Sequence, residues 1–367
     1  MMKATAAVLN QPNGPFDIEE IEVAEPQAGE IRIAIKAVGV CHTDLAVASG
    51  AFGLQFPAVL GHEGAGVVEA VGEGVTKVKA GDKVLLTFNS CGHCPTCDRD
   101  EPAYCDHFTE ANMLAVRGDG SSRLSRNGDK VSDNFFGQSS FATVAIANER
   151  NVLKVDNDAD LALLAPLGCG IQTGTGGVIN SLGAKEGETL VVLGAGAVGL
   201  SAVMGGKIAG CSTIIVVEPQ EGRRELAMKL GATHTLDGQG DVAAAVREIL
   251  PRGADMVIDT SGFVPVIEQS VNMIANRGRI GLIGVPGSLE AVLPVPLVQW
   301  LTQGGTLRGI VEGDSVPDEF LPRLVGWHKE GKLPLEVFSK TYPISQINEA
   351  IADAHSGKAV KAILTVD

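Results

Sequence analysis

Short apolar runs separated by glycine-containing turns organise the chain between residues 189 and 285. Two runs, Thr189–Leu193 and Thr213–Val217, carry no charge, and further strand-like runs follow at 254–258 and 279–285. The segments between them, such as residues 197–209, have a helical pattern. Short apolar strands that alternate with helices are typical of a parallel sheet covered on both faces. The pattern therefore predicts a doubly wound α/β sheet.

One stretch of 18 residues, 189–206, has no charged side chain and is long enough to raise the question of a membrane span. It contains five glycines and is followed at once by Lys207. A strand, a glycine turn and a buried helix explain this composition better than a span. The first ten residues lack a basic segment and a long apolar core, so we expect no signal peptide and a cytoplasmic protein.

The chain of 367 residues is long enough for two or three domains, each with its own hydrophobic core. It carries 29 basic and 44 acidic side chains, which gives a formal net charge of −15. This charge repels nucleic-acid phosphates and anionic lipids, so we expect neither as a partner. The 46 glycines follow no Gly-X-Y period, which excludes collagen and favours glycine turns of the α/β kind.

Four of the seven cysteines lie within 15 residues, which indicates a metal site in a chain without an export signal. Two-residue spacers bring thiolates to one point, as tetrahedral Zn²⁺ requires. An iron–sulfur cluster is the competing interpretation, but the Cys-x3-Cys-Pro ending of that motif is absent. Four thiolates leave no open position, so the zinc would be structural. The four are Cys91, Cys94, Cys97 and Cys105.

A second set of candidate ligands is spread over three loops. Cys41 follows an apolar strand-like segment, His62 lies between Gly61 and Glu63, and Cys169 lies between two glycines. Each of them alone has an ordinary explanation, such as a packed thiol or a loop histidine. Together they form a Cys2His set, and three protein ligands leave the fourth position of a catalytic zinc open.

A glycine motif, Gly194-x-Gly196-x2-Gly199, joins the strand Thr189–Leu193 to a helical stretch. The next predicted strand ends at Glu218, which lies 19 residues beyond Gly199. In a dinucleotide-binding fold the glycines let the backbone approach a pyrophosphate, and a carboxylate at this distance binds a ribose. The alternative interpretation is an ordinary glycine-rich turn.

The segment Gly61-His62-Glu63-x2-Gly66-x5-Gly72-x2-Val75 resembles the signature of zinc-containing medium-chain alcohol dehydrogenases. These enzymes are themselves the standard example of a Cys2His catalytic zinc. The four-cysteine loop, the Cys169 segment and the glycine motif follow in the family's order over essentially the whole chain. Residues 309–317, Gly-Ile-Val-Glu-Gly-Asp-Ser-Val-Pro, resemble the aryl-alcohol (benzyl alcohol) branch and its terpene-alcohol relatives.

This resemblance implies an α/β fold in which a Rossmann cofactor domain is inserted into a GroES-like, β-rich catalytic domain. The expected boundaries are 1–170 for the first part of the catalytic domain, 171–311 for the cofactor domain and 312–367 for the second part. Residues 117–138 are polar and rich in glycine, so we expect them to form a long surface loop.

The resemblance also implies the roles of individual residues. Cys41, His62 and Cys169 would hold the catalytic zinc, with Glu63 close by, and Asp44 would orient the imidazole of His62. Thr43 would accept the proton of the alcohol. The residues expected to bind the cofactor, NAD, are His42, Thr173, Gly194, Gly196, Val198, Gly199, Glu218, Arg223 and Lys361.

The chain departs from the best-known family pattern at Ala46, where a proton-carrying histidine is expected. His42 is the nearest ionisable side chain to Thr43 apart from Asp44, and an imidazole exchanges protons near neutral pH. We therefore expect protons to leave through His42 or water, unless His42 serves only to bind the cofactor pyrophosphate. At the cofactor, Glu218 is expected to favour NAD over NADP, because a 2′-phosphate would meet its charge.

These observations predict an enzyme with two zinc ions and NAD that interconverts a primary aromatic or allylic alcohol and its aldehyde. A dehydrogenase of other primary or aliphatic alcohols is the alternative within the family. A non-catalytic, zinc-stabilised NAD-binding protein is the alternative from a different class. The expected partners are a small-molecule alcohol or aldehyde and further copies of the chain in a homodimer or homotetramer.

Overall fold

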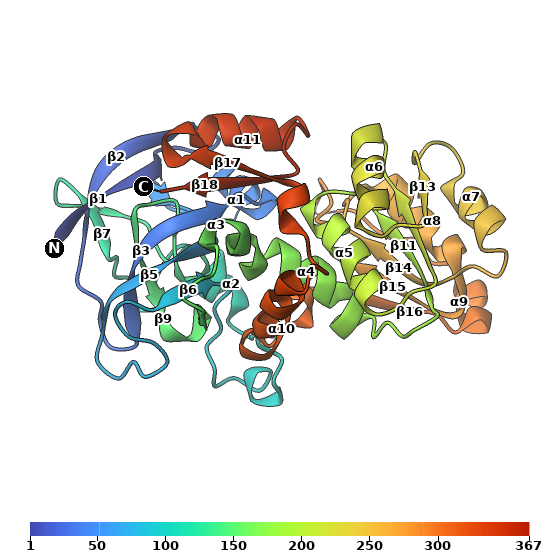
Figure 1. Cartoon of the computed structure of the whole chain (residues 1–367), viewed down its shortest axis with the longest axis horizontal. Coiled ribbons are helices and arrows are strands. Elements are labelled where there is room, and N and C mark those ends of the chain that lie inside the picture. Colours follow the sequence, from blue (N-terminus) through green and yellow to red (C-terminus); the bar gives the residue numbers. More distant parts are fainter. Residues whose placement is uncertain (51, 289, 367) are drawn as a thin grey trace. The chain divides into compact units, whose positions relative to one another are not determined.

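The computed structural model describes residues 1–50, 52–288 and 290–366 (Figure 1). The chain divides into two compact units. The first contains residues 1–169, 316–325 and 338–367, and the second contains residues 170–315 and 326–337. The helix α10, Pro317–Lys329, begins in the first unit and ends in the second.

The first unit is built on two β-sheets. One has the strand order β4-β1-β2-β7-β8, and the other has the order β10-β6-β5-β3-β18-β17 with β9 paired to β3. The strands are β1 Met2–Leu9, β2 Phe16–Val23, β3 Glu30–Gly39, β4 Ala58–Val59, β5 Glu63–Val71, β6 Lys83–Leu86, β7 Leu124–Arg126, β8 Asp129–Val131, β9 Val144–Asn148, β10 Val152–Val155, β17 Ser339–Pro343 and β18 Lys361–Thr365. All neighbouring strands are antiparallel except β17 and β18.

Alternation of side chains along these strands forms the core of the first unit. On β3, Ile31, Ile33 and Ile35 are fully or almost fully buried in one apolar cluster, as a two-residue period predicts. The α-helices of this unit are short: α1 His42–Ala48, α2 Phe108–Asn112, α3 Leu161–Leu164 and α11 Ile347–His355. The short helical turns η4 Glu149–Asn151 and η5 Ala165–Gly168 carry residues used below.

The second unit is a six-stranded parallel sheet with the order β13-β12-β11-β14-β15-β16. Its strands are β11 Thr189–Leu193, β12 Thr213–Val217, β13 His234–Leu236, β14 Ala254–Asp259, β15 Ile274–Leu282 and β16 Thr306–Gly309. Its helices are α4 Gly170–Gly176, α5 Ala197–Ile208, α6 Glu221–Leu230, α7 Val242–Ile249, α8 Val264–Met273 and α9 Leu297–Gln303. This is the strand order of a Rossmann fold, in which successive strands are added on one side of β11 and then, from β14 on, on its other side. The predicted fold class is therefore confirmed.

The prediction of a surface loop for residues 117–138 is wrong. The segment forms the β7–β8 hairpin and then enters the core, where Val131 and Phe135 are fully buried. Two of its three arginines, Arg117 and Arg123, bind the carboxylate of Glu30 at the start of β3. The polar composition of this segment therefore gave no indication that ion pairs and a few apolar side chains fix it in the first unit.

Among the described residues, no single helix has both the length and the apolar character needed to cross a membrane. Two adjoining segments, Leu161–Gly168 and Gly170–Ser181, meet the length and composition criteria only when taken together, and a sharp bend separates them.

Candidate functional site

Four side chains of the first unit converge on one point. The ligand atoms of Cys41, His62, Glu63 and Cys169 all lie within 4.8 Å of one another. His62 and Glu63 are fully buried, and Cys169 is 7% exposed. Two thiols, an imidazole and a carboxylate at this spacing form a donor set that suits Zn²⁺.

Different local structures bring these residues together. Cys41 follows β3 and caps the N-terminus of α1, and Cys169 ends the helical turn η5. His62 directly precedes β5, next to a tight turn at Gly61 whose φ is +90°. A Cβ atom at Gly61 would lie only 2.5 Å from the backbone nitrogen of Phe141, so this position requires glycine.

Asp44 holds two of these residues in place from a fully buried position. One of its oxygens accepts a hydrogen bond from the Cys41 N–H at 2.9 Å. The other lies 2.8 Å from Nδ1 of His62 and also accepts from the Gly61 N–H. A carboxylate on Nδ1 leaves Nε2 free to bind a metal. Nε2 of His62 is buried and has no hydrogen-bond partner, as expected of an atom reserved for a metal.

Aromatic and amide side chains pack around His62. The ring of Phe136 stacks on the imidazole at a centroid distance of 4.4 Å, and Phe135 meets it edge-on at 5.4 Å. The buried amide of Gln138 donates to the His62 carbonyl and accepts from the Gly64 N–H. All three side chains belong to the 117–138 segment, so that segment fixes the orientation of the histidine.

Charges around the cluster favour a thiolate at Cys41. A hydrogen bond from Cys169, opposed by burial and helped by His62, holds the pKa of Cys41 well below its usual range. Burial lowers the pKa of His62, but the carboxylate of Asp44 more than offsets this and raises it well above its usual value. Burial raises the pKa of Glu63 to about 7 even though Lys361 opposes it.

Lys361 lies in this cluster. Its buried ammonium group is 2.5 Å from Glu63 and donates to the carbonyl of Val40, the residue before Cys41. Thr43, in the first turn of α1, is also close, with its hydroxyl 3.8 Å from the Cys41 sulfur. His42 begins α1 and is exposed. A contact of Lys361 or His42 with the cofactor stays a prediction.

The second cysteine set is also brought together. The sulfur atoms of Cys91, Cys94, Cys97 and Cys105 lie within 4.8 Å of one another. Backbone N–H groups point at these sulfurs, including Cys91 and His107 toward Cys105 and Asp106 toward Cys94. Such donors stabilise thiolates, and the four sulfurs match the tetrahedral ligand set of a structural zinc. We call residues 91–105 the cysteine lobe.

Most of the predicted cofactor residues lie in the second unit, and several of them surround the glycine turn after β11. Gly194 has a φ of +96°, and a Cβ at Gly199 would lie 2.1 Å from the carbonyl oxygen of Gly194. No atom lies within 4 Å of a Cβ at Gly196, the N-cap of α5, so the backbone there is open to a ligand. A helix N-terminus behind an open glycine suits a phosphate group.

Glu218, at the end of β12, shapes the same turn. One of its carboxylate oxygens accepts from the Ala195 N–H at 2.8 Å, and the other accepts from the Gln220 N–H at 2.9 Å. Nε of Arg223 is buried without a hydrogen-bond partner. Val198 lies in the first turn of α5.

Thr173 has an acidic partner that the sequence did not suggest. The buried carboxylate of Glu312 accepts from the hydroxyl of Thr173 at 3.3 Å and from the side-chain amide of Gln172 at 3.1 Å. Glu312 has a φ of +49°, which is strained for a residue other than glycine. Only its place in the 309–317 motif could have drawn attention to it.

The comparisons with known proteins agree with this fold. The alcohol dehydrogenase GroES-like domain model matches residues 27–157, and the zinc-binding dehydrogenase model matches residues 197–327. The chain belongs to the zinc-type medium-chain alcohol dehydrogenase family and is a zinc-dependent alcohol dehydrogenase.

Similar proteins span its whole length. A geraniol dehydrogenase of Castellaniella defragrans is 44% identical over 99% of this chain and 98% of its own. A benzyl alcohol dehydrogenase structure from Acinetobacter calcoaceticus is 38% identical, covers 100% of both chains and has a TM-score of 0.96. An alcohol dehydrogenase zinc-binding domain protein from Burkholderia ambifaria is 45% identical, with a TM-score of 0.98 over 100% of this chain and 99% of its own.

Proposed function

We propose that this enzyme interconverts primary aromatic or allylic alcohols and their aldehydes by hydride transfer to and from NAD. The similarity to a geraniol dehydrogenase and a benzyl alcohol dehydrogenase supports the substrate class. The observation that carries the catalytic assignment is the unpartnered Nε2 of buried His62, which lies among Cys41, Cys169 and Glu63.

Cys41, His62 and Cys169 would hold the catalytic zinc, which would act there as a Lewis acid that lowers the pKa of the alcohol hydroxyl. The hydroxyl of Thr43, beside the Cys41 sulfur, accepts the proton of the alcohol. Asp44 keeps the imidazole of His62 in one tautomer, and Lys361 balances the negative charge of Glu63. The hydride chemistry itself belongs to the cofactor.

Gly194, Gly196, Val198 and Gly199 form the pyrophosphate-binding turn, and Glu218 selects NAD over NADP. The open backbone at Gly196 and the carboxylate position at the end of β12 support this assignment. Arg223 and Thr173 contribute further contacts to the cofactor, and Glu312 orients Thr173 through its hydroxyl.

His42 passes the proton on to solvent. Its exposed position, next to Thr43 in the first turn of α1, supports this role. We expect His42→Gln and His42→Arg to change the pH profile of alcohol oxidation, measured as kcat over pH 6 to 10. If both variants change only the KM for NAD, His42 binds cofactor and water carries the proton.

Two measurements test the proposed function. Elemental analysis of the purified protein should find two zinc ions per chain, and one metal or iron would contradict the assignment of the two clusters. A panel of benzyl, cinnamyl, geranyl and simple aliphatic alcohols should give the highest kcat/KM for the first three. Equal efficiency with ethanol would favour the aliphatic alternative, and no turnover of any alcohol would favour a non-catalytic role.

We also propose that the chain forms a homodimer or homotetramer in the cytoplasm. Five apolar side chains of the second unit are about three-quarters exposed: Val285, Val292, Leu297, Val298 and Leu301. The sheet of the same unit ends at the edge strand β16, all of whose residues are exposed. An exposed edge strand and exposed apolar side chains in one unit suit association with a second copy. We call these five residues with β16 the apolar edge.

A further inference from the structure

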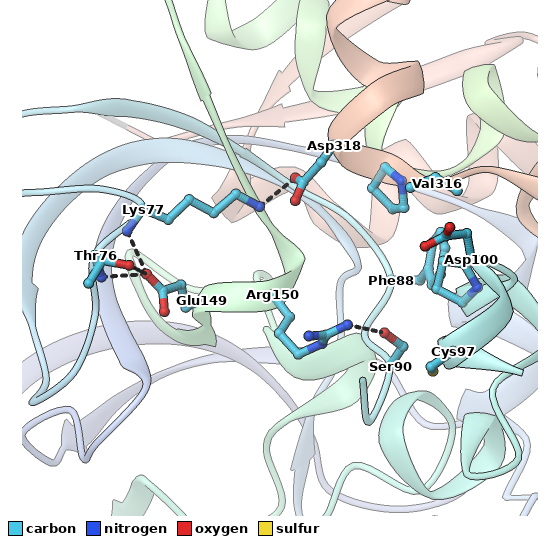
Figure 2. Close-up of a pocket in the computed structure, with 12 residues that line it drawn as sticks. Thr76, Lys77, Phe88, Ser90, Cys97, Asp100, Glu149, Arg150, Val316 and Asp318 are labelled. Atoms are coloured by element: carbon cyan, nitrogen blue, oxygen red, sulfur yellow. Dashed lines mark hydrogen bonds and ion pairs between the residues drawn. The ribbon is translucent and has the colours of Figure 1, made fainter. Parts of the chain in front are cut away.

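A pocket of about 340 Å³ opens in the first unit beside the cysteine lobe. Its lining includes Cys97 of the lobe, Ser90 just before it and Arg150 from the helical turn η4. Figure 2 shows the guanidinium of Arg150 extending across the pocket toward Ser90, with Cys97 on the same side. The guanidinium of Arg150 therefore lies at the edge of the proposed structural zinc site.

Two other charged side chains of the pocket, Lys77 and Glu149, have partners outside the cysteine lobe (Figure 2). Lys77 forms an ion pair with Asp318 at 2.5 Å. The carboxylate of Glu149 accepts from the backbone N–H groups of Thr76 and Lys77.

Arg150 instead lies against the backbone of the lobe. A Cβ atom at Gly92 would come within 2.3 Å of the guanidinium carbon of Arg150, so the guanidinium packs directly on this glycine. Its Nη2 also donates to the hydroxyl of Ser90 at 3.4 Å. Within the described part of the chain, the structure gives Arg150 no ion pair with a carboxylate.

Gly92 connects Arg150 to a metal ligand. Gly92 directly follows the metal ligand Cys91, so the guanidinium of Arg150 lies against the backbone next to a ligand of the proposed zinc. Gly92 has a φ of +75°, and this conformation together with the guanidinium leaves no room for a side chain. The arginine that belongs to the lobe, Arg99, is already paired with Glu101.

Four thiolates around one Zn²⁺ leave two net negative charges, which a nearby cation stabilises. We propose that Arg150 is a positioning residue of the structural zinc centre, which packs on Gly92 beside the ligand Cys91 and offsets the charge of the four thiolates. This inference rests on the proposed zinc of the cysteine lobe. The pocket would then keep the guanidinium of Arg150 beside Cys97 of the zinc centre.

The test compares zinc release from three full-length variants. Arg150→Met removes the charge and keeps the length, Arg150→Lys keeps the charge without the planar group, and Lys77→Met removes a charge from the same pocket without touching the lobe. Zinc is transferred to excess chelator and followed with a zinc-sensitive dye. The Cys94→Ser variant identifies which kinetic phase belongs to the lobe.

We expect Arg150→Met to release lobe zinc about three- to tenfold faster than the wild type, since outer-shell contacts affect metal retention by this order and Arg150 is solvent-exposed. The release rate of Arg150→Lys should lie between those of the wild type and Arg150→Met. The release rate of Lys77→Met should stay within about twofold of the wild-type rate. The ratio between Arg150→Met and wild type should shrink as salt rises from about 50 mM to 500 mM, because salt screens an exposed charge.

Three results would overturn the inference: equal release rates for wild type and Arg150→Met, equal acceleration by Lys77→Met, or a ratio that salt does not change. If Arg150→Met fails to fold, Arg150→Lys still tests the planar contact with Ser90 and Gly92. A wild-type protein that holds no zinc in the lobe contradicts the proposed metal assignment itself. The zinc content of the wild-type protein is measured before any release experiment, and it separates this outcome from the three results above.

Discussion

At the residue scale, Asp44 is the side chain on which the geometry of the first cluster depends most. It accepts a hydrogen bond from the backbone N–H of Cys41 and contacts the ring of His62 at the same time. We expect Asp44→Asn to weaken binding of the catalytic zinc about 10- to 100-fold, because the amide no longer supports the imidazole with a negative charge. Competition with a chelator measures this, with Asp129→Asn as an exposed control that should bind zinc as the wild type does.

We expect Glu218 to determine the choice between NAD and NADP. Its carboxylate caps the glycine turn through the Ala195 N–H and carries the charge that a 2′-phosphate would meet. Repulsion of this kind is worth on the order of 1–4 kcal/mol, so wild-type kcat/KM should favour NAD by roughly tenfold to a thousandfold. Glu218→Ala should reduce this preference and raise the KM for both cofactors, whereas Glu218→Asp should keep the preference. Equal use of NAD and NADP by the wild type would refute the assignment.

The candidate ligands could be named from the sequence because Cys and His are rare here and their spacing follows a family pattern. Gln138, Phe136 and Glu312 could not be named in the same way. Gln138 reaches the His62 carbonyl from 76 residues away, and Glu312 reaches Thr173 from 139 residues away. Contacts over such separations depend on how strands and turns are arranged, and a single sequence does not specify that arrangement.

At the scale of elements, the segment 117–138 is attached to β3 by a partly buried charge network. Glu30 accepts from both Arg117 and Arg123, and Arg117 also pairs with Asp133. Burial alone would raise the pKa of Glu30, but Arg123, the Gln27 N–H and Arg117 together lower it below its usual value. The same segment carries Phe136 and Gln138, so the network also supports His62.

We expect Glu30→Gln to lower the free energy of unfolding by about 2–3 kcal/mol at pH 7, because it leaves buried arginines with fewer partners. A lowered pKa contributes stability above the unfolded-state value and loses it as pH falls. The difference between wild type and variant should therefore be complete above about pH 5 and shrink below about pH 4. Urea denaturation over this range measures it. Glu20→Gln, which breaks the exposed pair with Lys3, should cost less than about 1 kcal/mol.

In the second unit the apolar runs predicted β11 and β12 with the observed bounds and indicated β14 and part of β15, whereas β13 and β16 were not predicted. The strands of the first unit were harder to predict from apolar periodicity. Its sheet pairs β3 with β18 from the other end of the chain, and its hairpin β7–β8 is made of polar residues. The GroES-like body was therefore expected from family resemblance rather than from periodicity.

At the scale of the whole molecule, the apolar edge predicts association. Replacing Leu301, which is 79% exposed, by Lys should shift the protein toward monomers in light scattering at micromolar concentration. Lys77→Met, far from this edge in the sequence and in the other unit, should leave the assembly unchanged. A wild-type protein that is monomeric at the same concentration would contradict the proposal.

The pairing of Lys361 with the Val40 carbonyl has a consequence for how the enzyme is made. These residues are 321 positions apart, and β18, which begins at Lys361, fills a place in the sheet beside β3. Ribosomes add about 5–20 residues per second, so roughly a quarter to one minute separates their synthesis. The four cysteines of the lobe have all been made by residue 105, and their contacts with Asp106, His107 and Arg150 follow by residue 150. The contact of Lys361 beside Cys41 forms only after the last strand has been made, so we expect the two proposed zinc ions to bind at different stages of synthesis.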